Sequence, residues 1–350
     1  MKKSSTRSRT IVGLDLSDKQ STFVVLDRGG KVVEEGKVRT TPSALAQQFR
    51  GAPSRIAMET GCHSPWVSRQ LSEMGHEVIV ANPRQVHLIS KSYRKSDRQD
   101  ALILARVARL DPALLGPVRH RSEEAQVDLA LLRSRDALVA TRTALVNHVR
   151  GSVKSLGERL PGCSAASFHK KVAAHIPAAL RLALGPVLAS ISELTAQIRA
   201  IDKEVMRLLK KYPAARALKE QIHGVGVLTA LAFVLTLEDH TRFAKSREVG
   251  AYLGLTRKRR ESGESEPELH ITKAGDPFLR RLLVQCAHYI LGPFGRQSDL
   301  RRWGMALAAR LGRKRAIIAV ARKLAVLMHR LWTTGEVYQP LRQLPAQAAA

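Results

Sequence analysis

Four acidic residues in the first hundred positions have the types and spacing for metal-assisted chemistry. Asp15 and Glu59 each end an apolar run, and Asp97 and Asp100 stand three residues apart at the start of a predicted helix, on one side of it. Packed carboxylates repel one another unless a cation lies between them, and Mg²⁺ prefers hard oxygen ligands. One or two Mg²⁺ ions can activate an attacking oxygen and stabilise a leaving oxygen in phosphodiester chemistry. These four residues are therefore candidates for metal ligands and catalytic residues, if the fold brings them together.

Each carboxylate alone also fits a structural role. An Asp after an apolar strand often forms a turn, and the charges of Asp97 and Asp100 suit the positive end of a helix. The metal interpretation therefore depends on the elements that would bring the four residues together.

The elements around these residues predict a mixed sheet with flanking helices. The Gly29-Gly30 pair predicts a hairpin turn between the second and third strands. The pattern resembles the ribonuclease-H-like fold, although a doubly wound nucleotide-binding fold fits almost as well. Strands are expected at 9–17, 22–27, 31–38, 55–59 and 76–81, and helices at 42–50, 63–74 and 97–109.

Residues 122–160 show apolar pairs every seven residues, which predicts a long amphipathic helix. A second helix is expected over 177–211, after a break at 161–170. Two interpretations stay open here, a helical hairpin within one chain and a coiled-coil arm that forms a dimer.

From Gln221 onward the pattern predicts a mainly α-helical part. Gly224 and Gly226 form a turn before an apolar helix, like a helix-hairpin-helix turn whose backbone amides hold a DNA phosphate. A long helix is expected from about 301 to 332. The expected domains are an α/β catalytic domain at 9–118, a helical coiled-coil region at 119–215, an α-helical domain at 216–335 and a loose tail at 336–350.

The charge of the chain favours a nucleic acid partner. It has 58 Lys and Arg against 30 Asp and Glu, a net charge of +28. Trp303, beside two arginines, has the type for base stacking, but such residues are more often packing residues. The residues expected to bind nucleic acid, besides the two glycines, are Arg94, Lys95, Arg98, Arg257, Lys258, Arg259, Arg260, Lys273, Arg280 and Arg281.

Cysteine and hydropathy patterns point to a reducing compartment and no membrane. Cys62, Cys163 and Cys286 are far apart and have no CxxC spacing, so free thiols in a cytoplasm are expected rather than a zinc site. No run of 18 apolar residues occurs, so no membrane-spanning helix is expected.

Several segments closely resemble the bacterial insertion-sequence transposases of the 110 family, and the Piv-type DNA invertases are similar. The resemblance covers roughly residues 10 to 332. Its motifs are GLDLSDK (13–19), AMETG (57–61), ANPRQV (81–86), KSDRQDA (95–101), IHGVGVLTALAFV (222–234), RFAKSREVGAYLGL (242–255), ESG (261–263) and ITKAGDPFLRRLLVQCA (271–287).

The resemblance implies a RuvC-like DEDD domain with Asp15, Glu59, Asp97 and Asp100 as metal ligands. It implies a serine nucleophile at Ser262, followed by Gly263, and a covalent phosphoserine link to DNA. It also implies an element-encoded guide RNA, the bridge RNA, which pairs with donor and target DNA. Two DNA duplexes must be cut, so we expect a dimer or tetramer, working at the bacterial nucleoid in the cytoplasm.

One feature departs from the family. Its loop after Ser-Gly is commonly basic and rich in glycine, whereas residues 264–268 read ESEPE here, and Ser265 lies close to the expected nucleophile. Three other functions stay open: a Piv-type site-specific invertase, a Holliday-junction resolvase or nuclease that uses water, and a non-enzymatic architectural nucleic-acid-binding protein.

Overall fold

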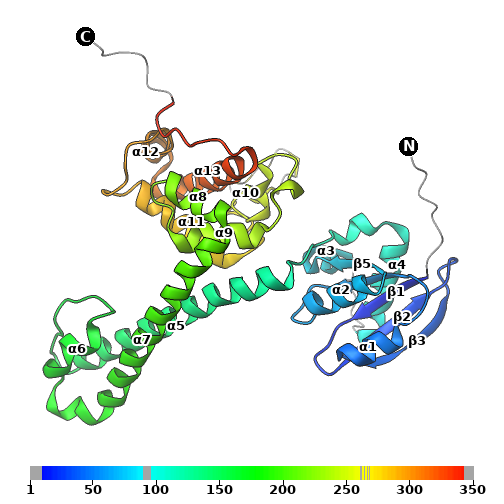
Figure 1. Ribbon diagram of the computed structural model, residues 1–350, viewed down its shortest axis with the longest axis horizontal. Helices are drawn as coiled ribbons and strands as arrows, with labels where there is room; N and C mark the ends of the chain where they lie inside the picture. Colours follow the sequence, from blue (N-terminus) through cyan, green and yellow to red (C-terminus); the bar gives the residue numbers. More distant parts are fainter. Residues whose placement is uncertain are drawn as a thin grey trace. The chain divides into compact units, whose positions relative to one another are not determined.

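The computed structural model describes residues 10–89, 96–260 and 269–342, with residues 262, 263, 265 and 267 between the last two ranges (Figure 1). The chain divides into two compact units, residues 1–123 and 124–350. Each unit has its own apolar core.

Unit 1 contains one five-stranded sheet in the order β3-β2-β1-β4-β5. The first three strands form an antiparallel meander, whereas β4 and β5 run parallel to β1. The predicted mixed sheet is confirmed, and its ribonuclease-H-like identity remains a prediction. The strands are β1 (Ile11–Asp15), β2 (Gln20–Leu26), β3 (Val32–Arg39), β4 (Arg55–Glu59) and β5 (Glu77–Ala81).

Helices cover both faces of this sheet. Side chains alternate between the faces of a strand, so Val12 and Leu14 of β1 pack toward α1 (Pro42–Gln48) and α2 (Ser64–Glu73), whereas Ile11 packs toward α4 (Asp97–Leu110). Two apolar cores result, one on each face. The helix α3 (Pro83–Ile89), which the sequence pattern did not predict, follows β5, and the short 3-10 helix η1 (Pro112–Leu115) follows α4.

A glycine allows α4 to lie directly on β1. A Cβ atom on Gly13 would lie 1.8 Å from the carbonyl oxygen of Ala101 and 2.8 Å from the nitrogen of Ala105. The close approach of helix and strand therefore requires a residue without a side chain at position 13.

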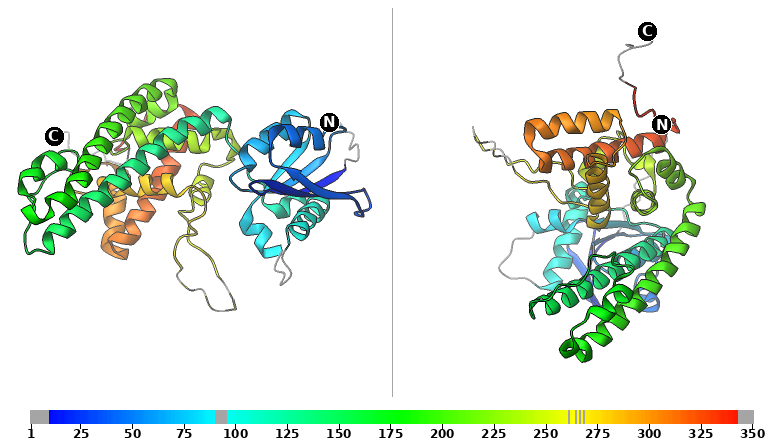
Figure 2. Two further views of the ribbon diagram at one scale, coloured as in Figure 1. Left: turned by 90° about the horizontal axis from the view of Figure 1, so that it is seen from below. Right: turned by 90° about the vertical axis from the view of Figure 1, so that its left-hand side faces the viewer.

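Unit 2 begins with two long antiparallel helices, α5 (Glu123–Lys154) and α7 (Arg181–Lys211), which lie side by side (Figure 2). Arg135 Nε donates to Asp202 Oδ1 at 2.5 Å between them. At the far end, an apolar cluster joins both helices to α6 (Phe168–Val172). The helical hairpin within one chain is confirmed, and its role in dimer formation remains a prediction. Two 3-10 helices, η2 (Ala173–His175) and η3 (Ala178–Leu180), lie between α6 and α7.

By length and composition alone, the helical segment 178–211 is long and apolar enough to cross a membrane. The sequence prediction did not foresee this, because it required 18 consecutive apolar residues. Ile191, Ile198 and Val205 of α7 are buried at heptad spacing, as in a helix that packs against another helix.

The rest of unit 2 is a bundle of helices around one apolar core. Its helices are α8 (Pro213–Gln221), α9 (Val227–Leu237), η4 (His240–Arg242), α10 (Glu248–Tyr252), α11 (Pro277–Ile290), α12 (Asp299–Leu311) and α13 (Arg313–Thr334).

Two predictions for this region were wrong. The single helix expected from 301 to 332 is interrupted at Gly312, whose φ of +84° cannot continue a helix. The tail expected to be loose over 336–350 is hydrogen bonded in its described part, 336–342: Asp299 N donates to Pro340 O at 2.7 Å, and Arg342 N donates to Asp299 Oδ2 at 2.9 Å, whereas 343–350 lie outside the described residues. We call residues 336–342 the C-terminal strap.

Candidate functional site

The register of unit 1 places Asp15 and Glu59 beside each other. The last pair between the parallel strands β1 and β4 joins Leu14 to Met58, so Asp15 and Glu59 come next in register at the carboxyl ends of the two strands. Leu14 and Met58 belong to the core on the α1 and α2 face. By alternation, the side chains of Asp15 and Glu59 therefore point to the α4 face.

The direction of α4 brings its first turn to the same edge. Arg55, the first residue of β4, donates from Nη1 to the carbonyl oxygen of Ala108 at 3.0 Å, near the end of α4. The helix therefore runs antiparallel to β1 and β4, and Asp97 and Asp100 lie at the end where these strands finish. Ser96 caps the helix, with Oγ accepting from the backbone nitrogen of Gln99 at 3.2 Å.

We call Asp15, Glu59, Asp97 and Asp100 the acidic edge. Asp97 is exposed and the other three are half-buried. Among the described residues, no three His, Cys, Asp or Glu side chains form a ready-made metal-binding group. The donor chemistry fits Mg²⁺ because all four residues supply hard carboxylate oxygens at the end of one sheet, but the carboxylates are not drawn together into a ligand shell.

Two further residues lie at this carboxyl edge, in the loops after β1 and β4. Asp18 Oδ1 lies 3.2 Å from His63 Nε2, and the indole nitrogen of Trp66 donates to His63 Nδ1 at 3.1 Å. Asp18 and His63 are 45 residues apart, so only the parallel pairing of β1 with β4 brings them together. The sequence alone did not predict this pair, because the two residues are distant along the chain.

Three basic residues predicted to bind nucleic acid precede or lie within the first turn of α4, and the structure describes one of them, Arg98. Arg98 binds Glu35 of β3 through Nε and Nη2, at 2.9 and 2.7 Å, and this pairing lowers the pKa of the Glu35 carboxyl. Arg94 and Lys95 lie outside the described residues. To bind nucleic acid, Arg98 would have to give up this exposed ion pair with Glu35, which costs little free energy.

Ser262 lies near the tip of a hairpin-like loop in unit 2, whose two sides meet in isolated antiparallel bridges at Arg257–Ile271 and Ser262–Ser265. Its backbone exchanges hydrogen bonds of 3.2 and 3.1 Å with Ser265, and Gly263 between them has a φ of +58°. Primed hairpin turns require such a positive φ. We call the described residues from Gly254 to Gly275 the serine hairpin; Figure 2 shows it leaving the helices of its unit. Ser262 is exposed, as are residues 257–260 on the segment before it.

The base of the serine hairpin is tightly closed. A Cβ atom on Gly254 would lie 2.3 Å from the backbone nitrogen of Ala274, and one on Gly275 would lie 2.1 Å from the carbonyl oxygen of Tyr252. Arg280 Nη1 donates to Leu253 O at 3.1 Å and to Ala274 O at 2.7 Å, so it joins the two strands. Lys273, in the same closure, has a φ of +54°.

Two ion pairs connect α11, which follows the hairpin, to the long helix α5. Asp276 caps α11 and accepts from Arg133 Nη2 at 2.5 Å, and Arg281 Nη2 donates to Asp136 at 2.5 Å. Arg280 and Arg281, which the sequence analysis predicts to bind nucleic acid, thus both have partners within the protein.

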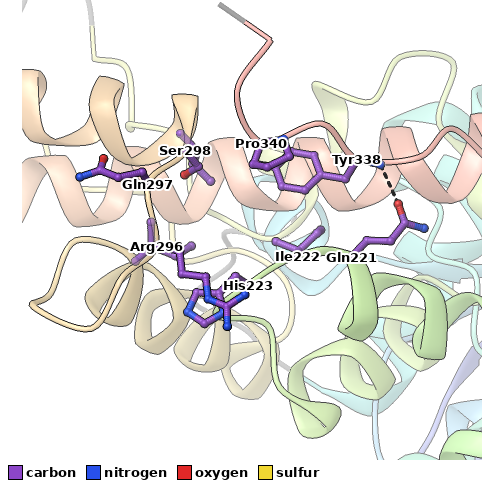
Figure 3. Close-up of a pocket in the computed structure, with 10 residues that line it drawn as sticks. Gln221, Ile222, His223, Arg296, Gln297, Ser298, Tyr338 and Pro340 are labelled. Carbon is purple, nitrogen blue, oxygen red and sulfur yellow. Dashed lines mark hydrogen bonds between the residues drawn. The ribbon is translucent and has the colours of Figure 1, made fainter. Parts of the chain in front are cut away.

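The turn between α8 and α9 contains the two glycines expected to hold a phosphate. Gly224 has a φ of +96°, and a Cβ atom there would lie 3.0 Å from Ile290 Cγ1. Gly226 precedes α9, and no side chain caps this helix. A cavity of about 160 Å³ adjoins the turn; in Figure 3, Arg296 and His223 lie together on one side of it. These features suit an anion, and phosphate binding here stays a prediction.

Comparisons with known proteins identify the family. The model of the DEDD transposase domain of the IS110 type matches residues 12–157, and that of the IS116/IS110/IS902 family of transposases matches residues 216–298. The transposase for insertion sequence element IS1111A of Coxiella burnetii is 31% identical over 340 residues, covering 94% of this chain and 91% of that protein. The chain belongs to the IS110 family of transposases. It is therefore a DNA-cutting and DNA-joining enzyme.

Other relatives of the transposase agree along nearly the whole chain. The transposase for insertion sequence element IS1328 of Yersinia enterocolitica is 29% identical over 337 residues, covering 94% of this chain and 98% of that protein. A probable family 20 transposase of Pseudomonas aeruginosa is 27% identical over 338 residues, with the same coverage. Of the two family models, the one that matches residues 12–157 contains the acidic edge, and the one that matches residues 216–298 contains the serine hairpin.

Proposed function

We propose that the transposase moves its insertion sequence by RNA-guided recombination, through a covalent phosphoserine intermediate and with Mg²⁺ at the acidic edge. The observation that carries the proposal is the register of β1 and β4 with the direction of α4, because together they gather Asp15, Glu59, Asp97 and Asp100 at one end of the sheet. Residues 9–118 then form the RuvC-like domain, 119–215 the helical arm and 216–335 the serine domain.

In this proposal Ser262 attacks the scissile phosphate. The bond from Ser262 Oγ to phosphorus forms as the bond to the departing sugar oxygen breaks, and the hydroxyl proton passes to a base or to that oxygen. A hydroxyl group of the new partner strand later displaces Ser262. Each step exchanges one phosphodiester bond for another, so no ATP is needed.

Two groups of residues would support this reaction. The exposed run from Arg257 to Arg260 supplies positive charge close to Ser262 for the phosphate. The acidic edge would hold Mg²⁺, which supplies charge stabilisation for the reacting phosphate when bound. Carboxylates without a cation repel one another, so we expect the four side chains to close together only when the metal binds.

The net charge of +28 supports binding of both DNA and RNA. We propose that the RNA is encoded by the element and specifies the donor and target sites, and that the protein acts as a dimer or tetramer at the nucleoid. Sequencing the RNA that co-purifies with the transposase tests the guide. Element-derived RNA supports it, and its absence favours a Piv-type invertase.

A DNA cleavage assay tests the acidic edge. Asp15→Asn should lower cleavage at least 100-fold, because loss of a ligand charge weakens the metal site. Asp27→Asn is the matched control: Asp27 lies in the turn after β2, at the opposite end of the sheet, and its contact from Lys31 N needs only an oxygen acceptor. Equal activity of the two variants would reject the metal site.

A further inference from the structure

A cavity of about 280 Å³ lies between α12, α13 and the C-terminal strap. Its apolar wall includes Leu300 and Leu331, which are both buried in the core. Two aromatic residues, Trp303 of α12 and Tyr338 of the strap, also line it. The cavity is many times the volume of a water molecule, so it has room for a flat organic ring.

The strap holds this cavity in shape. Tyr338 N donates to Gln221 Oε1 at 2.7 Å, the hydrogen bond drawn in Figure 3, and the strap is bound again at Pro340 and Arg342 by Asp299. Burial raises the pKa of the Tyr338 phenol, as expected for a side chain packed into the fold. Tyr338 is thus held in place before any ligand binds, which lowers the entropic cost of binding.

Three cations (Lys323, Arg330 and Arg342) and two carboxylates (Asp299 and Glu336) line the cavity. Lys323 Nζ lies 4.1 Å from the ring centroid of Trp303, and Arg330, which pairs with Glu336, lines another part of it. The two helices α12 and α13 contain nine Lys or Arg residues and one acidic residue, Asp299. This excess would attract a polyanion to the mouth of the cavity.

We propose that this cavity binds one unpaired nucleotide of the nucleic acid that the transposase handles. Lys323, which lies over the Trp303 ring in the free protein, moves aside to bind the phosphate, and the base takes its place on that ring, next to Tyr338. Stacking suits any base because each has a π-face, and the apolar wall adds burial. An acidic peptide would use the cations but not the two aromatic rings. The inference rests on the transposase acting on nucleic acid, and it does not depend on Ser262.

Photocrosslinking tests the proposal with full-length protein. Single-stranded DNA and RNA oligonucleotides carrying 5-iodouracil are irradiated with the protein, and the crosslinked peptides are mapped by mass spectrometry. We expect crosslinks at Trp303 or Tyr338, and the stronger of the two arms shows whether DNA or RNA occupies the cavity. Trp303→Leu should raise the Kd for the oligonucleotide about tenfold, and Trp303→Phe should restore most of the affinity.

Lys323→Gln and Arg322→Gln form a matched pair, since both remove one exposed charge from the same turn of α13 but only Lys323 lines the cavity. Lys323→Gln should lower the slope of log Kd against log salt by about one, and Arg322→Gln should lower it less. Crosslinks confined to other segments, or an unchanged Kd for Trp303→Leu, would overturn the proposal. Competition by polyglutamate without any crosslink at the cavity would indicate an acidic protein partner instead. Crosslinking needs no strand cleavage, so its failure is distinguishable from failure of the serine mechanism.

Discussion

At the residue scale, Asp97 and Asp100 fit two roles, and only one of them predicts that Mg²⁺ stabilises the protein. As charges at the start of α4 they would stabilise the helix with no metal present. As metal ligands they would repel Asp15 and Glu59 until a cation binds.

We predict that Mg²⁺ raises the thermal unfolding midpoint of the transposase, because a ligand that binds only the folded state stabilises it. Glu59→Gln should abolish this rise and leave the midpoint in EDTA unchanged or slightly higher, since one repelling charge is lost. Calorimetric scans with EDTA and with Mg²⁺ measure both effects. A Mg²⁺ response that persists in Glu59→Gln would refute the assignment.

His329 predicts a loss of stability in acid. It is buried in unit 2, where Nε2 contacts His240 O and Nδ1 contacts Ser246 Oγ, both at 2.9 Å. A carbonyl only accepts, so Nε2 carries the proton and Nδ1 accepts from the serine in the neutral ring. Burial lowers the pKa of His329 below its usual 6.5, despite the opposing contribution of the His240 carbonyl.

The unfolded chain therefore takes up a proton before the folded chain does as the pH falls below about 6.5. The free energy of unfolding should therefore fall as the pH falls, and the thermal unfolding midpoint should be a few degrees lower at about pH 5. His120 and His169, whose pKa values burial also lowers, act in the same direction. His329→Gln should flatten this pH dependence, and an unchanged slope in that variant would show that His329 does not contribute.

At the element scale, the packing of α4 on β1 brings the four residues of the acidic edge to one end of the sheet. Gly13→Val would place a side chain within the backbone of α4, where even a Cβ atom would lie 1.8 Å from Ala101 O. We predict destabilisation of about 3 kcal/mol or more, because strand and helix must separate. Gly36→Val is a milder control, since its Cβ would meet only the ring of Phe23, at 3.1 Å. Denaturant unfolding curves compare the two, and equal stabilities would show that α4 is not held against β1.

Most elements of unit 1 were predictable from the sequence, because apolar runs and the Gly29-Gly30 turn define the strands. The strand order was not, because pairing β1 with both β2 and β4 depends on contacts distant in sequence. The ends of β1 and β4 could be read from Asp15 and Glu59, but their adjacency could not.

The break between α12 and α13 was missed for a different reason. The apolar pattern runs on through Gly312, and a lone glycine in a helical pattern is often tolerated. The closure of the serine hairpin could not be predicted either. It depends on the close approach of the two backbone segments at Gly254 and Gly275, and on the hydrogen bonds of Arg280.

On the scale of the whole molecule, the two groups of residues proposed for the reaction belong to separate compact units. The acidic edge lies in residues 1–123 and the serine hairpin in 124–350. Neither unit alone contains both the proposed metal ligands and the proposed nucleophile, so we expect strand exchange to require the full chain.

The most direct test of the proposed mechanism is a search for a covalent protein–DNA adduct. The transposase is incubated with donor and target DNA, the candidate flanking RNA and Mg²⁺, then denatured, and the adduct is mapped by mass spectrometry. We predict a phosphodiester link at Ser262 that disappears in Ser262→Ala and remains in Ser265→Ala, three positions away in the same hairpin. Strand cleavage that persists in Ser262→Ala, with no adduct in the unaltered protein, would contradict the serine mechanism and favour attack by water.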